Sequence, residues 1–420
     1  MQIIKTKPHR LVNEKTLIAA VDVGKGSHTG YFRCPNGTDI RPFDFFNSGN
    51  GFQKFWEGIV EMKTRHNLTD VIVGFESTGP YAEPLLHYLR SKQARLVQVN
   101  PMHTKRLKEL QGNSPNKTDQ KDPKVIADII NLGHALSVIV PEGAAAELRR
   151  LTQARHRSVE RRSALYNQLQ HLLFVIFPEF TQVISNIKTK SAKYFLKRWS
   201  SPSEILNQNQ KAMERCMRKI SYGKISKDRI EALYTAARTT VGIRQGQEGI
   251  VMEIKNILQM IESADAFILD LEQTMSEKLT SIPYSQSILS IKGIGHVTAA
   301  GLIGEVGDFK QFKTISEITK LAGLDLFEIS SGKHRGTRRI SKRGRSLLRK
   351  FLYNAAVQMI SKVGIMKETY QNYLKRGMIK MKALTAIARK LLRVIFALVR
   401  DQSHYIHGYT ETKQMLPKAA

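Results

Sequence analysis

The first third of the chain alternates short apolar runs with segments of helical spacing. Apolar runs bounded by turn residues predict strands, and apolar positions recurring every three or four residues predict helices. The helical segments are Gly51–Thr64 and Pro80–Arg90. The predicted strands are Leu17–Asp22, Thr29–Phe32, Ile40–Phe46, Val71–Glu76 and Arg95–Val99. Strands and helices alternating at this spacing indicate an α/β domain.

Beyond Pro141 the pattern becomes helical. Glu147–Ile176 predicts one long helix, and residues 178–245 predict shorter helices. The clearest period in the chain then alternates steps of four and three, like a coiled-coil seam, and consists of Ile250, Ile254, Ile257, Ile261, Ala264, Ile268, Leu271 and Met275. Two interpretations stay open: an amphipathic helix packed inside its own domain, or a coiled-coil arm that pairs with another subunit.

The charge balance is strongly basic. The 66 Lys and Arg residues exceed the 36 Asp and Glu residues, giving a formal net charge of +30 and a sequence pI near 10.1. This balance indicates a polyanionic partner, with nucleic acid favoured over an anionic membrane surface. The apolar stretch 383–399 is interrupted by Arg389, Lys390 and Arg393, so we do not expect it to span a membrane.

Two further features bear on the compartment. The first ten residues lack the apolar core of a signal peptide, and Cys34 and Cys216 lack the spacing of a zinc site. We therefore expect a protein of a reducing cytoplasm.

Four acids stand out against this basic background. Asp22 and Glu76 end two apolar strands, and functional sites of open α/β sheets form outside the carboxyl ends of strands. Asp119 and Asp122 lie three residues apart and would share a face if one helix includes both. Converging carboxylates repel each other unless a cation lies between them, and Mg²⁺ with oxygen ligands suits phosphate chemistry. Two such ions about 4 Å apart can stabilise both oxygens of a phosphodiester displacement.

Each acid also has a purely structural explanation. An Asp after a strand is often a turn or cap residue, and Glu76 could face a helix dipole from the first turn. Asp119 or Asp122 could be the N-cap of the helix that follows. The complete set, in this order within one α/β domain, is more specific than any member.

The second half contains a glycine-rich turn and a basic run. Gly293-Ile-Gly295 lies between two helical segments, resembles a helix-hairpin-helix, and predicts backbone contacts to phosphate by Lys292, Gly293 and Gly295. From Ser331 to Lys350 there are nine Lys or Arg residues and no acid. A solvated face is the structural alternative, but such a run is typical of a polyanion site. The predicted nucleic-acid contacts there are Lys333, Arg335, Arg338, Arg339, Lys342, Arg343 and Arg345.

The N-terminal motifs resemble the RuvC-like branch of the ribonuclease H fold. Within that branch they resemble the DEDD transposases of the insertion-sequence-110 group, which are related to the Piv invertases. The matching stretches are VDVGK, GFESTGPYAEPL, VNPMHTKRLK and NKTDQKDPKVIADI. The family's tetrad falls on Asp22, Glu76, Asp119 and Asp122. Pro123 replaces the usual Ala, and proline fits the first turn of a helix.

The C-terminal motifs resemble the transposase domain of the same group. The stretches are LAGLDLFEISSGKHRG, ISKRGRSLLRKFLY and KMKALTAIARKLLRVIFAL. The family's nucleophilic serine aligns with Ser331, beside Ser330; by itself, a Ser-Gly pair in a loop is usually a turn. Leu326 stands where the family often has Pro. The resemblance covers residues 15–135 and 285–400.

We therefore expect a RuvC-like DEDD catalytic domain (1–140), a helical linker and coiled coil (141–280), a mostly helical transposase domain (281–405) and a tail (406–420). The resemblance implies cleavage and rejoining of DNA strands during transposition or site-specific recombination. It further implies Mg²⁺ at the tetrad, a phosphoserine intermediate, a structured guide RNA, and assembly as a homodimer or homotetramer. The expected partners are the double-stranded DNA of the element ends and of the target, in the nucleoid of a bacterial cytoplasm.

Three alternatives remain. A RuvC-like nuclease would use water instead of serine. An actin-like-fold, ATP-dependent sugar kinase could use the loop DVGKGSHTG from Asp22, but it needs an Asp-Gly-Gly loop and an adenosine loop that we do not find. A non-catalytic DNA-binding protein would explain the charge but would leave the four acids and Ser331 without roles.

Overall fold

The computed structural model describes residues 12–76, 79–111, 122–328, 336 and 338–406. The chain divides into two compact units, residues 1–139 and 140–420, and each is described by itself. Among the described residues, no helix is long and apolar enough to cross a membrane.

Unit 1 is built on a six-stranded mixed sheet of order β3-β2-β1-β4-β5-β6. The central strands β1, β4 and β5 are parallel, whereas β2, β3 and β6 run antiparallel to their neighbours. The predicted α/β domain is thereby confirmed. The strands are β1 (Thr16–Val23), β2 (Ser27–Arg33), β3 (Phe43–Phe46), β4 (Asp70–Glu76), β5 (Arg95–Val99) and β6 (Leu136–Ser137).

Helices cover both faces of this sheet, which is why its central strands are almost continuously apolar. Leu17, Ala19 and Val21 of β1 pack toward α1 (Gly49–Arg65) and α2 (Glu83–Ser91). Ile18 and Ala20 point to the other face, against α4 (Asp122–Asn131). The helix α3 (Pro101–Gln111) packs beside α4.

Two boundaries of the predicted elements in unit 1 differ from the prediction by three residues, and the others by at most two. The strand expected from Ile40 begins only at Phe43, and Ile40 instead lies in the connection from β2, where its N–H bonds to Phe32 O of that strand (3.0 Å). The helix expected from Pro80 opens with a 3₁₀ turn, Pro80–Ala82, before α2 begins at Glu83.

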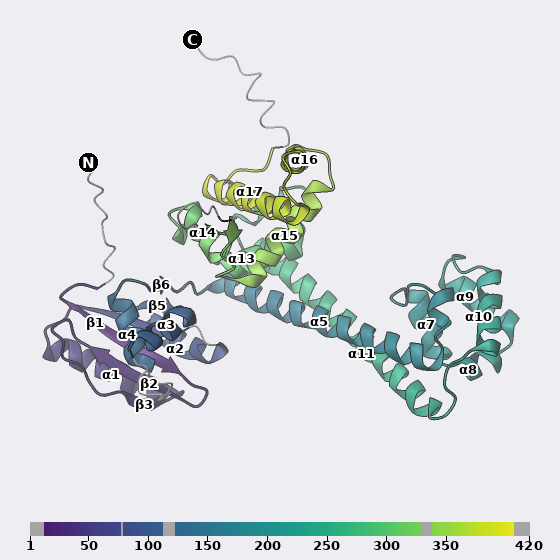
Figure 1. Cartoon of the computed structure of the whole chain (residues 1–420), viewed down its shortest axis with the longest axis horizontal. Helices are drawn as coiled ribbons and strands as arrows, with labels where there is room; N and C mark the ends of the chain where they lie inside the picture. Colours follow the sequence, from purple (N-terminus) through teal and green to yellow (C-terminus); the bar gives the residue numbers. More distant parts are fainter. Residues whose placement is uncertain (1–11, 77–78, 112–121, 329–335, 337, 407–420) are drawn as a thin grey trace, which may run out of the picture. The chain divides into compact units, whose positions relative to one another are not determined.

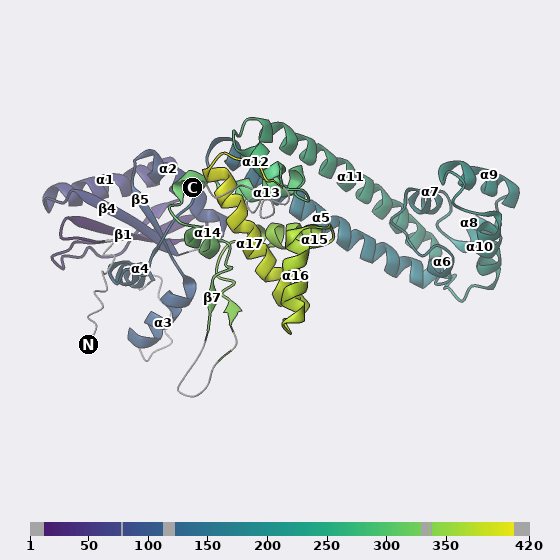
Figure 2. The ribbon, with the colours of Figure 1, turned by 90° about the horizontal axis from the view of Figure 1, so that it is seen from above.

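Unit 2 contains a pair of long antiparallel helices, α5 (Gly143–Ile176) and α11 (Gln247–Thr280), which lie side by side in both views (Figures 1 and 2). Polar pairs join them: Arg155 to Glu272, Arg162 to Asp265, and Gln168 to Glu253. Five shorter helices share a hydrophobic core with the far halves of both helices. They are α6 (Phe180–Val183), α7 (Lys190–Arg198), α8 (Pro202–Leu206), α9 (Gln210–Ile220) and α10 (Lys227–Thr239).

The predicted seam lies on α11, and most of it is buried inside this single chain. Ile254, Ile257 and Ile261 join the core shared with α5 and the shorter helices. Further along, Ile268, Leu271 and Met275 are also at most 7% exposed. An amphipathic helix packed within its own chain therefore accounts for the pattern. Pairing with a second subunit remains a prediction.

The remaining helices of unit 2 gather where α5 begins and α11 ends (Figure 1). Tight packing holds them: a Cβ on Gly304 of α13 (His296–Val306) would lie 2.6 Å from the backbone nitrogen of Arg149 in α5. Two short strands, β7 (Leu326–Phe327) and β8 (Arg339–Ile340), interrupt an otherwise helical region. The helices are α12 (Ser285–Leu289), α13 (His296–Val306), α14 (Ile315–Leu321), α15 (Ser346–Ile360), α16 (Ile365–Lys375) and α17 (Lys380–Arg400), with a 3₁₀ turn at Phe309–Gln311.

Candidate active site

Asp22 and Glu76 lie at the carboxyl ends of neighbouring parallel strands. The register pairs Ala20 with Gly74 and Val21 with Phe75, which places the two acids at the next level of the sheet. Side chains alternate along a strand, so Asp22 faces the same side as Ala20, and Glu76 the same side as Gly74. A Cβ on Gly74 would lie 2.2 Å from Ile130 Cδ1 of α4. The two half-buried acids therefore share the sheet face that α4 covers.

Asp122 is the first residue of α4, and α3 joins it to Glu76. Thr104 Oγ1 donates a hydrogen bond to Glu76 Oε2 (2.9 Å), and Lys108 Nζ lies 2.5 Å from Asp122 Oδ1. Thr104 and Lys108 are four residues apart on α3 and so lie on one helical face. This arrangement brings Glu76 and Asp122 to the same edge of the sheet. A salt bridge between Asp128 and Arg33 fixes α4 on β2.

The donor chemistry at this edge fits a hard divalent cation, because every predicted ligand is a carboxylate. Within the described ranges, however, no three His, Cys, Asp or Glu side chains are grouped closely enough to hold a metal ion. The hydroxyl of Thr104 and the ammonium of Lys108 contact two of the acids instead. Asp119, the fourth predicted ligand, lies outside the described residues.

The predicted nucleophile also lies outside the described residues, as do Ser330, Lys333 and Arg335. The segment that contains them connects β7 to β8. Leu326 pairs with Ile340 and Phe327 with Arg339 across these strands. Ser341 N donates a hydrogen bond to Asp325 O (2.8 Å). This bond joins the residue just before β7 to the residue just after β8.

The described basic residues after this connection fall into two groups. Arg338, Arg339, Lys342 and Arg343 are exposed, although Arg338 pairs with Glu328 at 2.9 Å. Arg345 instead has a side chain only 17% exposed, with its Nε 4.0 Å from Oε2 of buried Glu305. Burial, together with the charge of neighbouring Arg149, lowers the pKa of Arg345 to about 10, although the carboxylate of Glu305 opposes both effects.

The segment predicted as a helix-hairpin-helix contains α12, α13 and residues 290–295 between them. Ile291 and Ile294 are buried and anchor the turn, whereas Lys292 and Gly295 are exposed. Gly293 has φ +112°, a conformation that favours glycine.

Three residues at these sites had no role in the sequence interpretation: Thr104, Lys108 and Glu305. Thr104 and Lys108 lie in the stretch VNPMHTKRLK, which contributed to the family resemblance without assigning a role to either residue. Glu305 is the single acid in the apolar helix α13. A lone acid on an apolar helix signals a buried ion pair, because burying an unpaired carboxylate is costly.

Comparisons with known proteins point in one direction. Residues 19–178 match the IS110 model of DEDD transposases, described as a transposase, and residues 285–371 match the transposase family IS116/IS110/IS902. The IS110 protein of Streptomyces coelicolor (43.6 kDa) is 22% identical over 92% of this chain and 94% of its own length. The IS116 protein of Streptomyces clavuligerus (44.8 kDa) is 24% identical over 68% of this chain and 72% of its own. The transposase for IS1111A of Coxiella burnetii is 29% identical over 38% and 46%.

Proposed function

This chain belongs to the transposase family of the IS110 and IS116 insertion elements, and we propose that it cleaves and rejoins DNA with a DEDD tetrad and a serine nucleophile. The observation that carries the proposal is the placement of three acids. Asp22 and Glu76 end adjacent parallel strands, and α3 links Glu76 to Asp122 through Thr104 and Lys108. Asp119 completes the tetrad by sequence.

The sheet supports a ribonuclease H-like, RuvC-related fold for residues 1–140. Its order β3-β2-β1-β4-β5, with β2 antiparallel between two neighbours and β4 and β5 parallel to β1, suits that fold. Such a sheet places acids from β1 and β4 at one edge, where a substrate can approach. The division of unit 2 into residues 141–280 and 281–405, with a tail at 406–420, is part of the same proposal.

The tetrad Asp22, Glu76, Asp119 and Asp122 would hold Mg²⁺. When bound, the metal supplies positive charge that stabilises the oxygens of a phosphodiester during displacement. In this chain, Asp122 must exchange the ammonium of Lys108 for the metal, and Glu76 keeps or releases the hydroxyl of Thr104. Thr104 and Lys108 both lie on α3, so the position of α3 determines whether their hydroxyl and ammonium groups contact the acids.

Ser331 would form the covalent link to DNA. Its Oγ attacks a phosphorus atom, the new Oγ–P bond replaces one P–O bond to a deoxyribose, and the serine proton goes to the departing hydroxyl. The phosphoserine ester conserves the bond energy, so the strand can be rejoined by the reverse reaction without ATP. Exposed Arg338, Arg339, Lys342 and Arg343 would neutralise DNA phosphates nearby. Lys333 and Arg335 extend this group by sequence.

The remaining parts of the proposal concern partners. Double-stranded DNA of the element ends and of the target is the substrate. A guide RNA and a homodimer or homotetramer follow from the family resemblance, and a net charge of +30 suits binding of two nucleic acids. The bacterial nucleoid is where such a protein would act.

Trapping the covalent intermediate tests the proposal. A DNA substrate nicked near the crossover should leave wild-type protein attached to DNA after denaturation, and proteolysis should remove the attachment. Ser331→Ala should bind DNA and form no adduct, whereas Ser330→Ala should form it normally. If Ser331→Ala forms the adduct as well as wild type, another residue is the nucleophile. If wild type cuts DNA without any adduct, the protein is a nuclease that uses water.

A further inference from the structure

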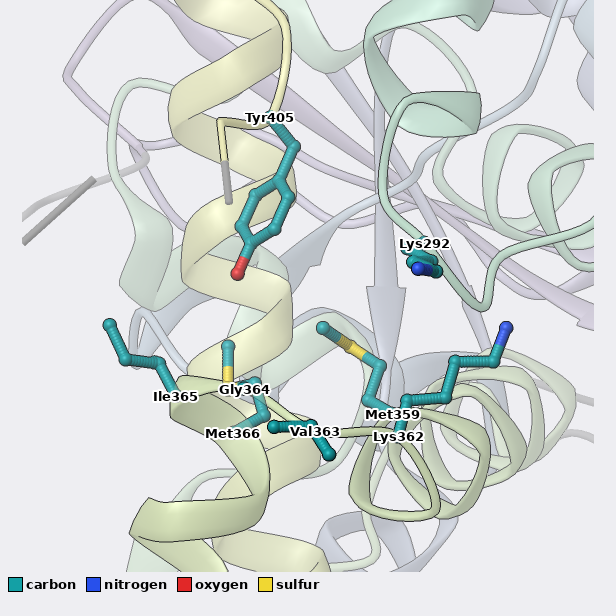
Figure 3. A pocket seen from close by; sticks show the side chains of 8 residues that line it. All are labelled: Lys292, Met359, Lys362, Val363, Gly364, Ile365, Met366 and Tyr405. Carbon is teal, nitrogen blue, oxygen red and sulfur yellow. The ribbon is translucent and has the colours of Figure 1, made fainter. Parts of the chain in front are cut away.

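A small pocket in unit 2 lies where the hairpin 290–295 meets the turn between α15 and α16. Figure 3 shows Lys292 and Lys362 on one side of it, with Tyr405 facing them and Met359 between. The cavity volume is about 20 Å³. That volume holds one or two waters and excludes a nucleobase or a small metabolite. Any larger ligand must therefore contact the rim of the pocket, where the lysines are.

Each of the two turns that meet here carries a lysine two or three residues before a glycine N-cap. Lys292-Gly-Ile-Gly295 precedes α13, and Lys362-Val-Gly364 precedes α16. Gly295 and Gly364 are the N-caps of these helices, and neither cap has a side-chain hydrogen bond. Gly364 has φ +145° and therefore, like Gly293, a conformation that favours glycine.

The turns are also in direct contact. A Cβ on Gly293 would lie 3.6 Å from Met359 Cγ and 3.7 Å from Gln358 Cβ at the end of α15. Tyr405, beyond α17, donates its backbone N–H to Ser290 Oγ (2.8 Å) and lines the same pocket. The relative position of the two lysine-bearing turns is thus fixed by packing from both sides.

The two lysines line the pocket, and both are exposed. Within the part of the chain that the structure describes, neither ammonium group has an ion-pair or hydrogen-bond partner. Two like charges at one rim repel each other, and an anion placed between them removes that repulsion. Glycine turns add backbone N–H groups that a side chain would otherwise screen, which is a recurring way to bind phosphate.

We propose that Lys362 and Gly364 form a second phosphate-binding turn, which acts with Lys292 and the hairpin to hold the phosphodiester backbone of a nucleic acid. This inference rests on the proposed function only in taking nucleic acid as the partner. It adds Lys362 to the predicted contacts. Two adjacent turns grip successive phosphates of one strand, so they bind backbone without reading sequence.

Salt-dependent binding by the full-length protein tests the inference. Each lysine–phosphate contact contributes about 0.9 to the slope of log K against log salt on duplex DNA, and about 0.7 on a single strand. Binding is measured in EDTA to a short fluorescent DNA duplex of arbitrary sequence and, separately, to a single-stranded RNA. Lys362→Gln and Lys292→Gln should each reduce the magnitude of the slope on one of the probes, by the amount given for that probe. The double variant should reduce it by about twice as much.

The matched control is Lys375→Gln, an exposed lysine at the other end of α16. It makes the same charge change and should leave the slope at the wild-type value. A loss on the duplex alone identifies DNA as the ligand, and a loss on the single strand alone identifies RNA. The inference is wrong if Lys362→Gln keeps the wild-type slope on both probes, if Lys375→Gln lowers it equally, or if wild type binds neither probe.

These outcomes are separate from those of the covalent-adduct experiment, because they measure binding alone and do not depend on cleavage of the probe. A protein that forms the serine adduct but shows no slope change for Lys362→Gln would retain the proposed function and lose this site. A protein with the slope change but no adduct would retain the site and lose the proposed chemistry.

Discussion

The ammonium group of Lys108 lies 2.5 Å from Oδ1 of Asp122, so a predicted metal ligand already carries a positive charge from the protein itself. The Asp122 side chain is only 15% exposed and the Lys108 side chain 34%. A pair at this depth is held more firmly than one on an open surface. Lys108 would therefore compete with a metal ion for Asp122.

Removing this competitor should strengthen metal binding. For Lys108→Gln we expect the dissociation constant for Mn²⁺ to fall by about tenfold, equivalent to ~1.4 kcal/mol. Titration calorimetry or the paramagnetic resonance of free Mn²⁺ measures this without DNA. Lys105→Gln, an exposed lysine of the same helix, should leave it unchanged. Weaker Mn²⁺ binding by Lys108→Gln would mean that Lys108 organises the acids instead of competing for them.

Glu305→Gln should destabilise unit 2. The carboxylate is 3% exposed and lies 3.9 Å from Arg149 Nε and 4.0 Å from Arg345 Nε. Without its charge, two poorly solvated guanidinium groups face each other. We expect the free energy of unfolding to fall by about 2 kcal/mol, below the range for a fully buried pair because both arginines are partly exposed. Urea unfolding measures the loss.

Glu231→Gln, at an exposed position on α10, is the control for this loss and should stay within about 0.5 kcal/mol of wild type. An unchanged urea midpoint for Glu305→Gln would show that Arg149 and Arg345 are adequately solvated without the carboxylate.

Two glycine-to-alanine substitutions should change stability in opposite directions. At Gly304, a Cβ would lie 2.6 Å from backbone nitrogen of Arg149, so α13 must move off α5 and stability should fall by about 1–3 kcal/mol. At Gly249, in the first turn of α11, nothing lies within 4 Å of an added Cβ. Stability there should rise by up to about 1 kcal/mol, because alanine favours helix. Thermal unfolding of both variants checks the contrast, which fails if Gly304→Ala is neutral.

Acid should weaken the pairing of α11 with its neighbours through Asp265. Burial raises the pKa of this carboxyl, but hydrogen bonds from Lys193 and Arg162 outweigh burial and bring the pKa below its ordinary value of 3.8. A carboxyl with a lowered folded-state pKa contributes stability that is complete above pH 3.8 and is lost as pH falls through the folded-state pKa. Asp265→Asn should therefore lower stability at neutral pH and flatten its fall below pH 4.

The measurement for Asp265 is the urea midpoint as a function of pH. Asp270→Asn, on an exposed position of the same helix, should follow the wild-type curve. Equal slopes below pH 4 for wild type and Asp265→Asn would show that the Lys193 and Arg162 contacts do not persist in solution.

Local pattern was enough to predict strands β1 to β5 of unit 1 and the long helices of unit 2, but not the two-residue strand β6. Arg95–Val99 was predicted to the residue, because Leu96, Val97 and Val99 make a short apolar, β-branched run that ends before Asn100-Pro101. The seam on α11 predicted burial but not the partner, since a period of 3.5 describes contact with any helix. The strands β7 and β8 have two residues each and are too short to form a pattern.

The side-chain partners of the acids were beyond the sequence. The spacing of Asp22 and Glu76 predicted a shared sheet edge, but nothing in it selected Lys108 from 66 basic residues as the counterion of Asp122. That choice depends on the angle at which α3 packs. Lys362-Val-Gly364 likewise resembles many ordinary turns, and only its contact with the hairpin gives it a role.

The paired helices α5 and α11 have a consequence for how relatives of this chain can vary. Ile243 N bonds to Val175 O (3.1 Å), so the seventy or so residues that leave at the end of α5 return beside their starting point. A segment closed in this way can be shortened, enlarged or exchanged without disturbing α12–α17. Removing seven matched residues from both α5 and α11 would bring helices α6–α10 closer to α12–α17 by ~10 Å, and it would keep the seam in register. The helix pair is thus an adjustable spacer, and its length sets the reach of whatever the distal helices carry.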